Sequence, residues 1–318
     1  DVFTSDLLKL KHRGPDDYGT YFDNTIALGQ TRLSIIDLSK KGHQPMISNC
    51  ENYIIIFNGE IYNFEEIRAD LISKNYKFNS NTDTEVILNG YIEYKEQIVN
   101  KLNGMFAFSI YDKTNEELFL ARDRSGIKPL YTYHDDKTFT FASEIKSIKR
   151  FSKGIDTNSK ILFFLLGYIP EPVTIYENIY SFPAGCFGFL KNNKLSIKEF
   201  DKYNYEPKIN KPYKEIISDV KELFNNSIKR HLISDAPIGT FLSGGLDSSI
   251  ITAVAAQYKT DLQTLSLVFD EKELSEEKYQ DLIVKKYNTK HTKYLINESL
   301  FLDNIDDYFK AMEQPTID

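Results

Sequence analysis

A glycine-rich turn joins a strand to a helix at Phe241-Leu242-Ser243-Gly244-Gly245-Leu246-Asp247-Ser248-Ser249. The apolar run 236–242 leads into this turn, and the helix-compatible run 250–256 follows it at once. Two adjacent glycines allow the backbone to turn tightly and to approach an anion without interference from Cβ atoms. The serine hydroxyls add donors to the unpaired N–H groups at the start of the helix. The sequence therefore predicts a phosphate-binding loop within a β–α unit.

Asp247 is the residue of this loop that needs explanation, because a carboxylate repels phosphate. A divalent cation held between the carboxylate and the phosphate oxygens would remove the repulsion. The alternative is a plain Gly-Gly turn whose Asp and Ser residues only cap the helix. The cluster of small and polar residues in one turn favours the phosphate interpretation.

The loop resembles the S-G-G-x-D-S loop of the ATP pyrophosphatases, and it lacks the G-K-[ST] of a Walker A loop. In that family the loop grips the pyrophosphate while ATP adenylates a substrate. The resemblance implies ATP and Mg²⁺ as cofactors, with Asp247 reaching the pyrophosphate through the metal. It implies backbone contacts to adenine at Phe241 and Leu267, although core strand positions would carry the same apolar residues. The implied ATP-binding residues are Phe241, Leu242, Ser243, Gly244, Gly245, Leu246, Asp247, Ser248, Ser249 and Leu267.

Composition sets bounds on the class of protein. The chain has 318 residues, 41% of them hydrophobic and 27% charged, as in an ordinary soluble globular protein. A net charge of −7 argues against a nucleic-acid partner, because binding to a phosphate backbone needs a basic surface. No apolar run approaches the length of a membrane span. The two cysteines, Cys50 and Cys186, have no metal-ligand spacing and suit a reducing cytoplasm.

Length and local composition predict two domains, 1–205 and 213–318. The predicted linker is the stretch 202–212, which has two prolines and mixed charge. In the first domain, β-rich runs broken by turns over 105–142 predict an antiparallel sheet with helices packed on it.

The second domain continues the β–α unit. A strand over 262–269, a helix over 276–287 and a strand over 291–295 give the order βαβαβ, which predicts a doubly wound parallel sheet. Before them, a helix over 213–233 presents one apolar face. That face consists of Ile216, Val220, Leu223, Phe224 and Ile228.

Two local signals in the first domain predict specific structure. Asn58-Gly59 is the strongest short hairpin signal a sequence offers, and it places Glu60-Ile61-Tyr62 on the return strand. Asn63, with Glu66 three residues on, has the spacing of a capping box at the start of a helix.

The same region has five residues that would bind a substrate, and all of them except Glu60 also have a plainer interpretation. Arg32 would take a carboxylate bidentately, or form a surface ion pair. Asn58 and Gly59 would present a side-chain amide and a backbone N–H to an oxyanion, or only form a turn. Glu60 and Asp83 would bind an ammonium group, although Asp83 alone fits equally well as a helix cap.

Taken together, five ordered segments resemble the class II glutamine amidotransferase domain, an N-terminal-nucleophile hydrolase. The resemblance, followed by S-G-G-L-D-S, is to the glutamine-hydrolysing asparagine synthetases and covers nearly the whole chain. The segments are His12-Arg13-Gly14-Pro15-Asp16, Arg32-Leu33-Ser34-Ile35-Ile36-Asp37, Asn58-Gly59-Glu60-Ile61-Tyr62-Asn63, Thr82-Asp83-Thr84-Glu85 and 121–131.

The resemblance implies a fold and a set of roles. The fold is an α+β sandwich of four layers, α-β-β-α, followed by an incomplete α/β doubly wound ATP pyrophosphatase domain. Asn58 and Gly59 match the oxyanion hole. The implied glutamine-binding residues are Arg32, Leu33, Ser34, Ile35, Ile36, Asn58, Gly59, Glu60 and Asp83.

One departure concerns the nucleophile, which in that family is a cysteine at the mature N-terminus. Its free α-amine acts as the base for its own thiol. Residue 1 here is Asp1, and neither Cys50 nor Cys186 has a free amine. We therefore expect a fragment that lacks the first strand, the nucleophile, and the later part of the synthetase domain.

The resulting hypothesis is ATP-dependent amidation of aspartate to asparagine through an aspartyl-AMP intermediate, with ammonia from glutamine. The partners implied are glutamine, aspartate and ATP, with no nucleic acid and no membrane; a homodimer is left open. One alternative is a related amidotransferase that amidates another carboxylate, as in surface polysaccharide synthesis. Another is a degenerate homologue without catalysis, which the absent cysteine supports and the intact glutamine-site motifs oppose.

Overall fold

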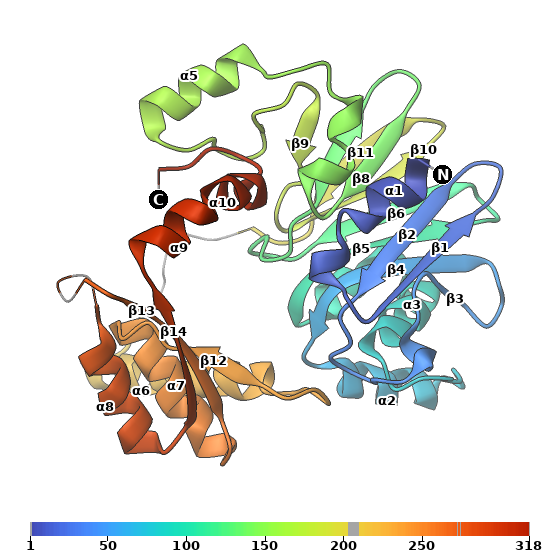
Figure 1. The fold of residues 1–318 in the computed structure, drawn as a ribbon. Coiled ribbons are helices and arrows are strands. Elements are labelled where there is room, and N and C mark those ends of the chain that lie inside the picture. Colours follow the sequence, from blue (N-terminus) through green and yellow to red (C-terminus); the bar gives the residue numbers. More distant parts are fainter. Residues whose placement is uncertain (1, 203–209, 272, 274, 318) are drawn as a thin grey trace. The chain divides into compact units, whose positions relative to one another are not determined.

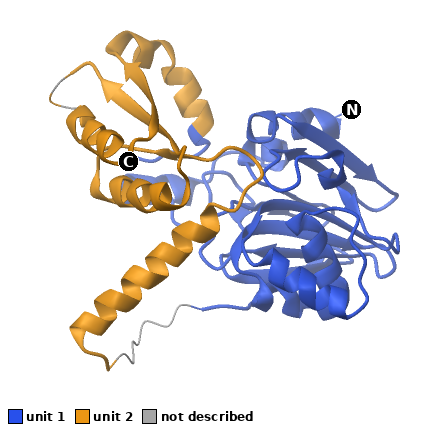
Figure 2. Cartoon of the chain, turned by 90° about the horizontal axis from the view of Figure 1, so that it is seen from below, with its two compact units in different colours: residues 1–204, 312–318 blue, residues 205–311 orange. Residues whose placement is uncertain are grey.

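The computed structural model describes residues 2–202, 210–271, 273 and 275–317, and the chain forms two compact units (Figures 1 and 2). Unit 1 comprises Asp1–Asn204 and Met312–Asp318, and unit 2 comprises Tyr205–Ala311. Most of the predicted linker, 203–209, lies outside the described residues. No described helix is long and apolar enough to cross a membrane.

The central element of unit 1 is a six-stranded antiparallel sheet in the order β11-β10-β6-β5-β4-β3. A two-stranded sheet, β1-β2, and a three-stranded sheet, β8-β7-β9, form a second β layer. The bounds are β1 Asp17–Phe22, β2 Ala27–Arg32, β3 Met46–Ile47, β4 Tyr53–Ile61, β5 Gly104–Asp112, β6 Glu117–Arg122, β7 Tyr131–His134, β8 Phe139–Ala142, β9 Ile179–Ser181, β10 Cys186–Lys191 and β11 Lys194–Glu199.

Alternation along β4 produces two cores, because successive side chains of a strand point to opposite faces. Ile55 and Phe57 pack against helices α2 and α3, whereas Ile54 and Ile56 pack toward the second β layer. Short helices cover the outer side of that layer, so the order of layers is the expected α-β-β-α (Figure 1). The helices of unit 1 are α1 Val2–Leu8, α2 Phe64–Ser73, α3 Asp83–Tyr94, α4 Ile98–Lys101 and α5 Thr157–Leu166, with 3₁₀ turns that include η4 Ile145–Ser147 and η5 Lys149–Phe151.

The predicted hairpin at Asn58-Gly59 is wrong. Both residues lie inside the nine-residue strand β4, where Asn58 pairs with Ala107 and Gly59 with Phe106. Glycine is needed here for close approach, since a Cβ atom on Gly59 would lie 2.2 Å from the carbonyl oxygen of Met105. The local sequence signal for a turn therefore reflects tight packing between two strands.

The predicted capping box at Asn63 is also wrong, although α2 begins at the next residue. The Asn63 side chain makes no cap hydrogen bond. Its amide instead donates to the carbonyl of Lys101 (2.9 Å) and accepts from the N–H of Asn103 (2.9 Å). The side chain of Asn63 thus hydrogen-bonds with residues distant in sequence instead of capping the first turn of α2.

Unit 2 contains three parallel strands in the order β12-β13-β14. Helix α7 follows β12 and helix α8 follows β13, which confirms the predicted βαβαβ order. The bounds are α6 Tyr213–His231, β12 Gly239–Phe241, α7 Leu246–Tyr258, β13 Gln263–Phe269, α8 Glu277–Tyr287, β14 Lys290–Ile296, α9 Glu298–Asp303 and α10 Ile305–Met312.

Burial in unit 2 is partial. Of the five residues on the expected apolar face of α6, Ile228 is buried, whereas Val220 and Leu223 are 56% and 69% exposed. Strand β13 is buried on one face only: Thr264 and Val268 point inward and Leu267 is 56% exposed. A small core around Ile228, Leu232, Val254, Ala255 and Leu262 joins α6, α7 and the start of β13.

Candidate active sites

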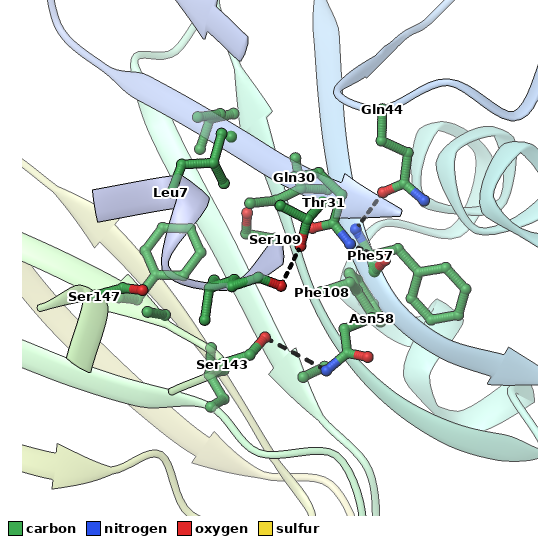
Figure 3. A pocket seen from close by; sticks show the side chains of 18 of the residues that line it. Leu7, Gln30, Thr31, Gln44, Phe57, Asn58, Phe108, Ser109, Ser143 and Ser147 are labelled. Carbon is green, nitrogen blue, oxygen red and sulfur yellow. Dashed lines mark hydrogen bonds between the residues drawn. The ribbon is translucent and has the colours of Figure 1, made fainter. Parts of the chain in front are cut away.

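A cavity of about 480 Å³ opens between the layers of unit 1. Residues from β2, β4, α3 and the loop after β2 line it. Figure 3 shows Gln30 and Thr31 of β2 and Phe57 and Asn58 of β4 at its wall. All but one of the predicted glutamine-binding residues belong to this lining: Arg32, Leu33, Ile35, Ile36, Asn58, Gly59, Glu60 and Asp83. The exception is Ser34, whose backbone N–H donates to Asp16 Oδ2 at 2.8 Å.

Hydrogen bonds from two glutamines hold β4 beside Asn58. Gln44 accepts from the N–H of Phe57 at 2.7 Å, and Gln30 donates to the carbonyl of the same residue at 3.0 Å. The Asn58 amide lies 3.4 Å from Ser143 Oγ (Figure 3). Neither glutamine nor Ser143 belongs to a motif, and the sequence offered no signal for these partners.

Arg32 does not form the surface ion pair that was the plainer interpretation. It is only 8% exposed, and it donates to the carbonyls of Ser39 (3.1 Å), Asp37 (2.6 Å) and Ile36 (3.3 Å). A Cβ atom on Gly42 would lie 2.0 Å from an Arg32 nitrogen, so the next turn fits only around this side chain. Arg32 therefore shapes the loop that borders the cavity.

Asp83 is the first residue of α3, and the helix cap is its neighbour Thr82, which accepts from the N–H of Glu85. The helix-cap interpretation of Asp83 is thus wrong. Its Oδ2 accepts from the N–H of Ile61 at 3.0 Å. Burial raises the pKa of the Asp83 carboxyl to about 7, and the nearby Glu60 charge adds to the shift against hydrogen bonds from the backbone. A cation arriving in the cavity would favour its ionised form.

Lys128 also lines the cavity, and no role was assigned to it from the sequence. Its backbone is held on both sides: Asp123 accepts from its N–H and Arg122 donates to its carbonyl, each at 2.9 Å. Burial lowers the pKa of the Lys128 ammonium, and the charge of Glu60 opposes that shift. Lys128 lies in the segment 121–131, one of the five that resemble the amidotransferase domain, and this position was the sequence signal that could have identified it.

Neither cysteine of the chain lines the cavity. Cys50 is exposed, and Cys186 lies in the core between the two β layers. Burial raises the pKa of the Cys186 thiol, which makes it a poor nucleophile.

The second site is the glycine-rich loop of unit 2, which connects β12 to α7 as predicted. Ser243 and Ser248 are joined through their hydroxyls at 2.9 Å, and the Ser243 hydroxyl accepts from the N–H of Gly245 at 3.2 Å. Gly244 has φ +98°, a conformation that side chains other than hydrogen rarely permit. Hydroxyls and N–H groups thus gather at the start of α7, where the helix dipole favours an anion.

Asp247 does not cap the helix. The N-cap is Gly245, without a side-chain cap, and the exposed Asp247 stands in the first turn. Phe241 is 86% exposed and Leu267 56% exposed, so the core-strand alternative fails for both side chains.

The loop offers a metal one carboxylate, that of Asp247. The described residues contain no cluster of three or more His, Cys, Asp or Glu side chains that could hold an ion without a ligand. Magnesium is commonly bound by one or two carboxylates together with substrate phosphates. Asp247 fits a Mg²⁺ that arrives with a nucleotide.

Comparison with known proteins assigns each half of the chain. Residues 1–203 match the family model described as glutamine amidotransferase domain, and residues 219–318 match asparagine synthase. The chain is 40% identical to asparagine synthetase [glutamine-hydrolyzing] 1 of Bacillus subtilis, over 83% of this chain and 42% of the relative. It is 34% identical to asparagine synthetase [glutamine-hydrolyzing] 3 of the same organism, over 96% of this chain and 53% of the relative. The chain thus spans about half the length of these relatives.

Among solved structures, the glutamine phosphoribosylpyrophosphate amidotransferase of B. subtilis aligns with 85% of this chain and 67% of its own. The alignment has a TM-score of 0.42 and 14% identity. The family match to residues 1–203 covers more than half of the chain. The chain therefore belongs to the glutamine amidotransferase family, and from residue 219 it continues into a region of the asparagine synthase family.

Proposed function

We propose that this chain is part of a glutamine-hydrolysing asparagine synthetase. Unit 1 would release ammonia from glutamine, and unit 2 would take part in activating aspartate with ATP. The observation that carries the proposal is convergence: Arg32, Asn58 and Asp83, from three separate segments, line one cavity in the family's own domain. The asparagine synthetase relatives have the same two regions in one polypeptide.

The cavity has the chemistry that free glutamine requires. Arg32 would offer its remaining donors to the α-carboxylate, and the carboxylates of Glu60 and Asp83 would take the α-ammonium group. The Asn58 amide and the Gly59 N–H would stabilise the oxyanion that forms when a nucleophile attacks the side-chain amide.

We propose that the nucleophile is a cysteine on a strand that precedes Asp1 in the same polypeptide. Two strand edges support this proposal: among the described strands, β2 pairs with β1 alone and β8 with β7 alone, apart from an isolated bridge between Arg32 of β2 and Pro15. Both strands contribute to the wall of the cavity. One added strand would complete the second β layer along the wall of the cavity that Asn58 also lines.

In unit 2 the donors of the glycine-rich loop would hold the pyrophosphate of ATP. Asp247 would hold Mg²⁺, which would offset the negative charge of the phosphates during attack at the α-phosphorus. The carboxylate of the acceptor would attack the α-phosphorus and release pyrophosphate. Ammonia would then attack the acyl carbon and release AMP.

Aspartate is the favoured acceptor because the relatives named above are asparagine synthetases. The experiment is to supply the full-length polypeptide with ATP, Mg²⁺, glutamine and a panel of carboxylic acids, and to measure pyrophosphate release. Aspartate should give the fastest release. Release with another acid alone would favour the related amidotransferase, and none at all with intact folding would favour a degenerate homologue. The expected cytoplasmic location and homodimer stay predictions.

A further inference from the structure

Gln280 connects two loops of unit 2 through a single amide group. It lies on α8 and is only 1% exposed. Its Nε2 donates to the carbonyl of Ser243 at 3.0 Å and to the carbonyl of Leu267 at 3.2 Å. Ser243 opens the glycine-rich loop, and Leu267 lies in β13, at the position where an adenine contact is expected.

The geometry fixes which way the amide points. Both partners are carbonyl oxygens, so the NH₂ group must face them, since the opposite orientation would oppose three acceptors. The other end of the amide, Oε1, is buried and has no hydrogen-bond partner among the described residues. A buried acceptor without a partner costs stability, and this cost offsets part of what the two donated bonds contribute. What the glutamine supplies at this position is therefore the pair of donated bonds that joins the loop to β13.

Packing places the loop directly against α8. A Cβ atom on Gly244 would lie 2.9 Å from the Cβ of Glu276 and 3.4 Å from the Cγ of Gln280. From the other side, the Ser266 hydroxyl donates to the carbonyl of Leu242, the residue before the loop. The loop backbone thus contacts β13 on one side and α8 on the other. Gln280 is a residue of α8 whose side chain hydrogen-bonds with both the loop and β13.

We propose that Gln280 is a positioning residue for the nucleotide site. It fixes the spacing between the loop that would hold the polyphosphate and the β13 backbone that would contact adenine. The inference rests on the proposed ATP function of unit 2. Loss of the two donors would let the loop and the strand shift independently, so a nucleotide would have to order them when it binds.

The first test is Gln280→Met in the full-length polypeptide, with Gln257→Met as the matched control, because Gln257 is exposed on α7 and donates only within its own helix. The equilibrium dissociation constant for ATP–Mg²⁺ is measured by calorimetry, and the melting temperature is measured alongside. Gln280→Met should weaken ATP binding roughly tenfold. Its melting temperature should fall only slightly, because the two carbonyls lose their donor while the unpaired Oε1 is removed. The control should change neither quantity.

The second test is Gln280→Glu, which keeps the shape and turns the donors into a carboxylate facing two carbonyls. Burial would raise the pKa of that carboxyl, and protonation would restore one donor. ATP binding by this variant should therefore improve as the pH falls from about 8 to about 6, relative to wild type. A role in core packing alone would not produce this pH dependence.

The outcomes separate the inference from the function on which it rests. Normal ATP binding by Gln280→Met and by Gln280→Glu at every pH would overturn the positioning role and leave the ATP function standing. Weakened binding that comes with a large fall in melting temperature, and with no pH dependence in Gln280→Glu, would also overturn it. If the wild-type protein binds no ATP, the positioning role and the ATP function both fail.

Discussion

Burial sets the charge state of Asp83, the carboxylate expected to bind the glutamine ammonium. Its folded-state pKa of about 7 lies above its ordinary value of 3.8. A raised carboxyl pKa contributes stability that is complete below pH 3.8 and is lost as the pH rises through 7. Asp83→Asn removes this titration, because an amide does not ionise. The amide oxygen can still accept the hydrogen bond from the N–H of Ile61.

We expect the Asp83→Asn variant to be more stable than wild type by about 1–3 kcal/mol at pH 8. The gap should grow as the pH rises through the pKa window and stay constant above it. Chemical denaturation of both proteins between pH 4 and pH 8 measures this difference. An equal free energy of unfolding at all pH values would mean that Asp83 is solvated in the folded protein.

The same titration should appear in glutamine binding. A protonated Asp83 cannot pair with an ammonium group, so the KM of wild type for glutamine should rise as the pH falls below about 7. In Asp83→Asn the KM should be high and nearly independent of pH. Steady-state glutaminase kinetics of the full-length polypeptide test this. The ammonia-dependent reaction is the control, and at each pH it should be the same in wild type and in Asp83→Asn.

Arg32 separates two roles that a single alanine substitution would confuse, since it holds the loop over 36–39 and borders the cavity. Arg32→Ala should raise the KM for glutamine about tenfold to a hundredfold. Arg32→Lys keeps the positive charge but loses the bidentate fork, so its KM should lie between. Ammonia-driven synthesis should survive in both variants. An equal loss of both activities would assign Arg32 to structure alone.

At the scale of elements, patterning along the chain predicted most strands and helices. The strand predicted over 262–269 is β13, and the helix predicted over 276–287 is α8. The errors fall where a distant segment decides the local structure. The backbone of Met105 leaves no room for a Cβ atom at Gly59. Lys101 and Asn103 hydrogen-bond with the side chain of Asn63, which therefore does not cap α2.

The candidate site follows the same division. Quoted motifs supplied the residues that line the cavity, whereas the partners that fix them were not visible in the sequence. Gln30 and Ser143 touch β4 across long sequence separations, and neither type of contact has a local pattern. Burial was also invisible, which is why the pKa shift of Asp83 needed the structure.

Gly59→Ala tests the close approach of β4 and β5. The added Cβ atom would meet the carbonyl oxygen of Met105 at 2.2 Å, so one strand must move. We expect a loss of about 1–3 kcal/mol in the free energy of unfolding and a severe loss of glutamine hydrolysis. The control is Gly188→Ala in β10, whose nearest atom would lie at 3.0 Å. Comparable losses in the two variants would argue against a special approach at Gly59.

Asp247→Asn tests the start of α7. Because Asp247 is not the N-cap, the change should barely alter the melting temperature. ATP-dependent synthesis should fall steeply, since a neutral side chain no longer holds Mg²⁺ beside the phosphates. Glutamine hydrolysis without ATP should remain near normal. Pyrophosphate release with ammonia as donor, titrated over Mg²⁺, measures the effect; wild-type rates at every concentration would exclude Asp247 from the site.

At the scale of the whole molecule, the proposed glutamine pocket and the proposed nucleophile lie in different segments of the polypeptide. A protein of these 318 residues should release no glutamate from glutamine, because neither of its two cysteines lines the cavity. In the full-length polypeptide, replacing both Cys50 and Cys186 by serine should leave hydrolysis intact. Glutamate formed by the 318-residue protein, or activity lost in the double variant, would show that the nucleophile has been misplaced.

The most direct measurement follows the amide nitrogen through the full-length polypeptide. The protein is supplied with glutamine labelled with ¹⁵N in the side-chain amide, aspartate, ATP and Mg²⁺, and the products are quantified. The account predicts labelled asparagine, AMP and pyrophosphate in equal amounts, with at least as much glutamate. Glutamate without labelled asparagine, or ADP in place of AMP, would contradict it.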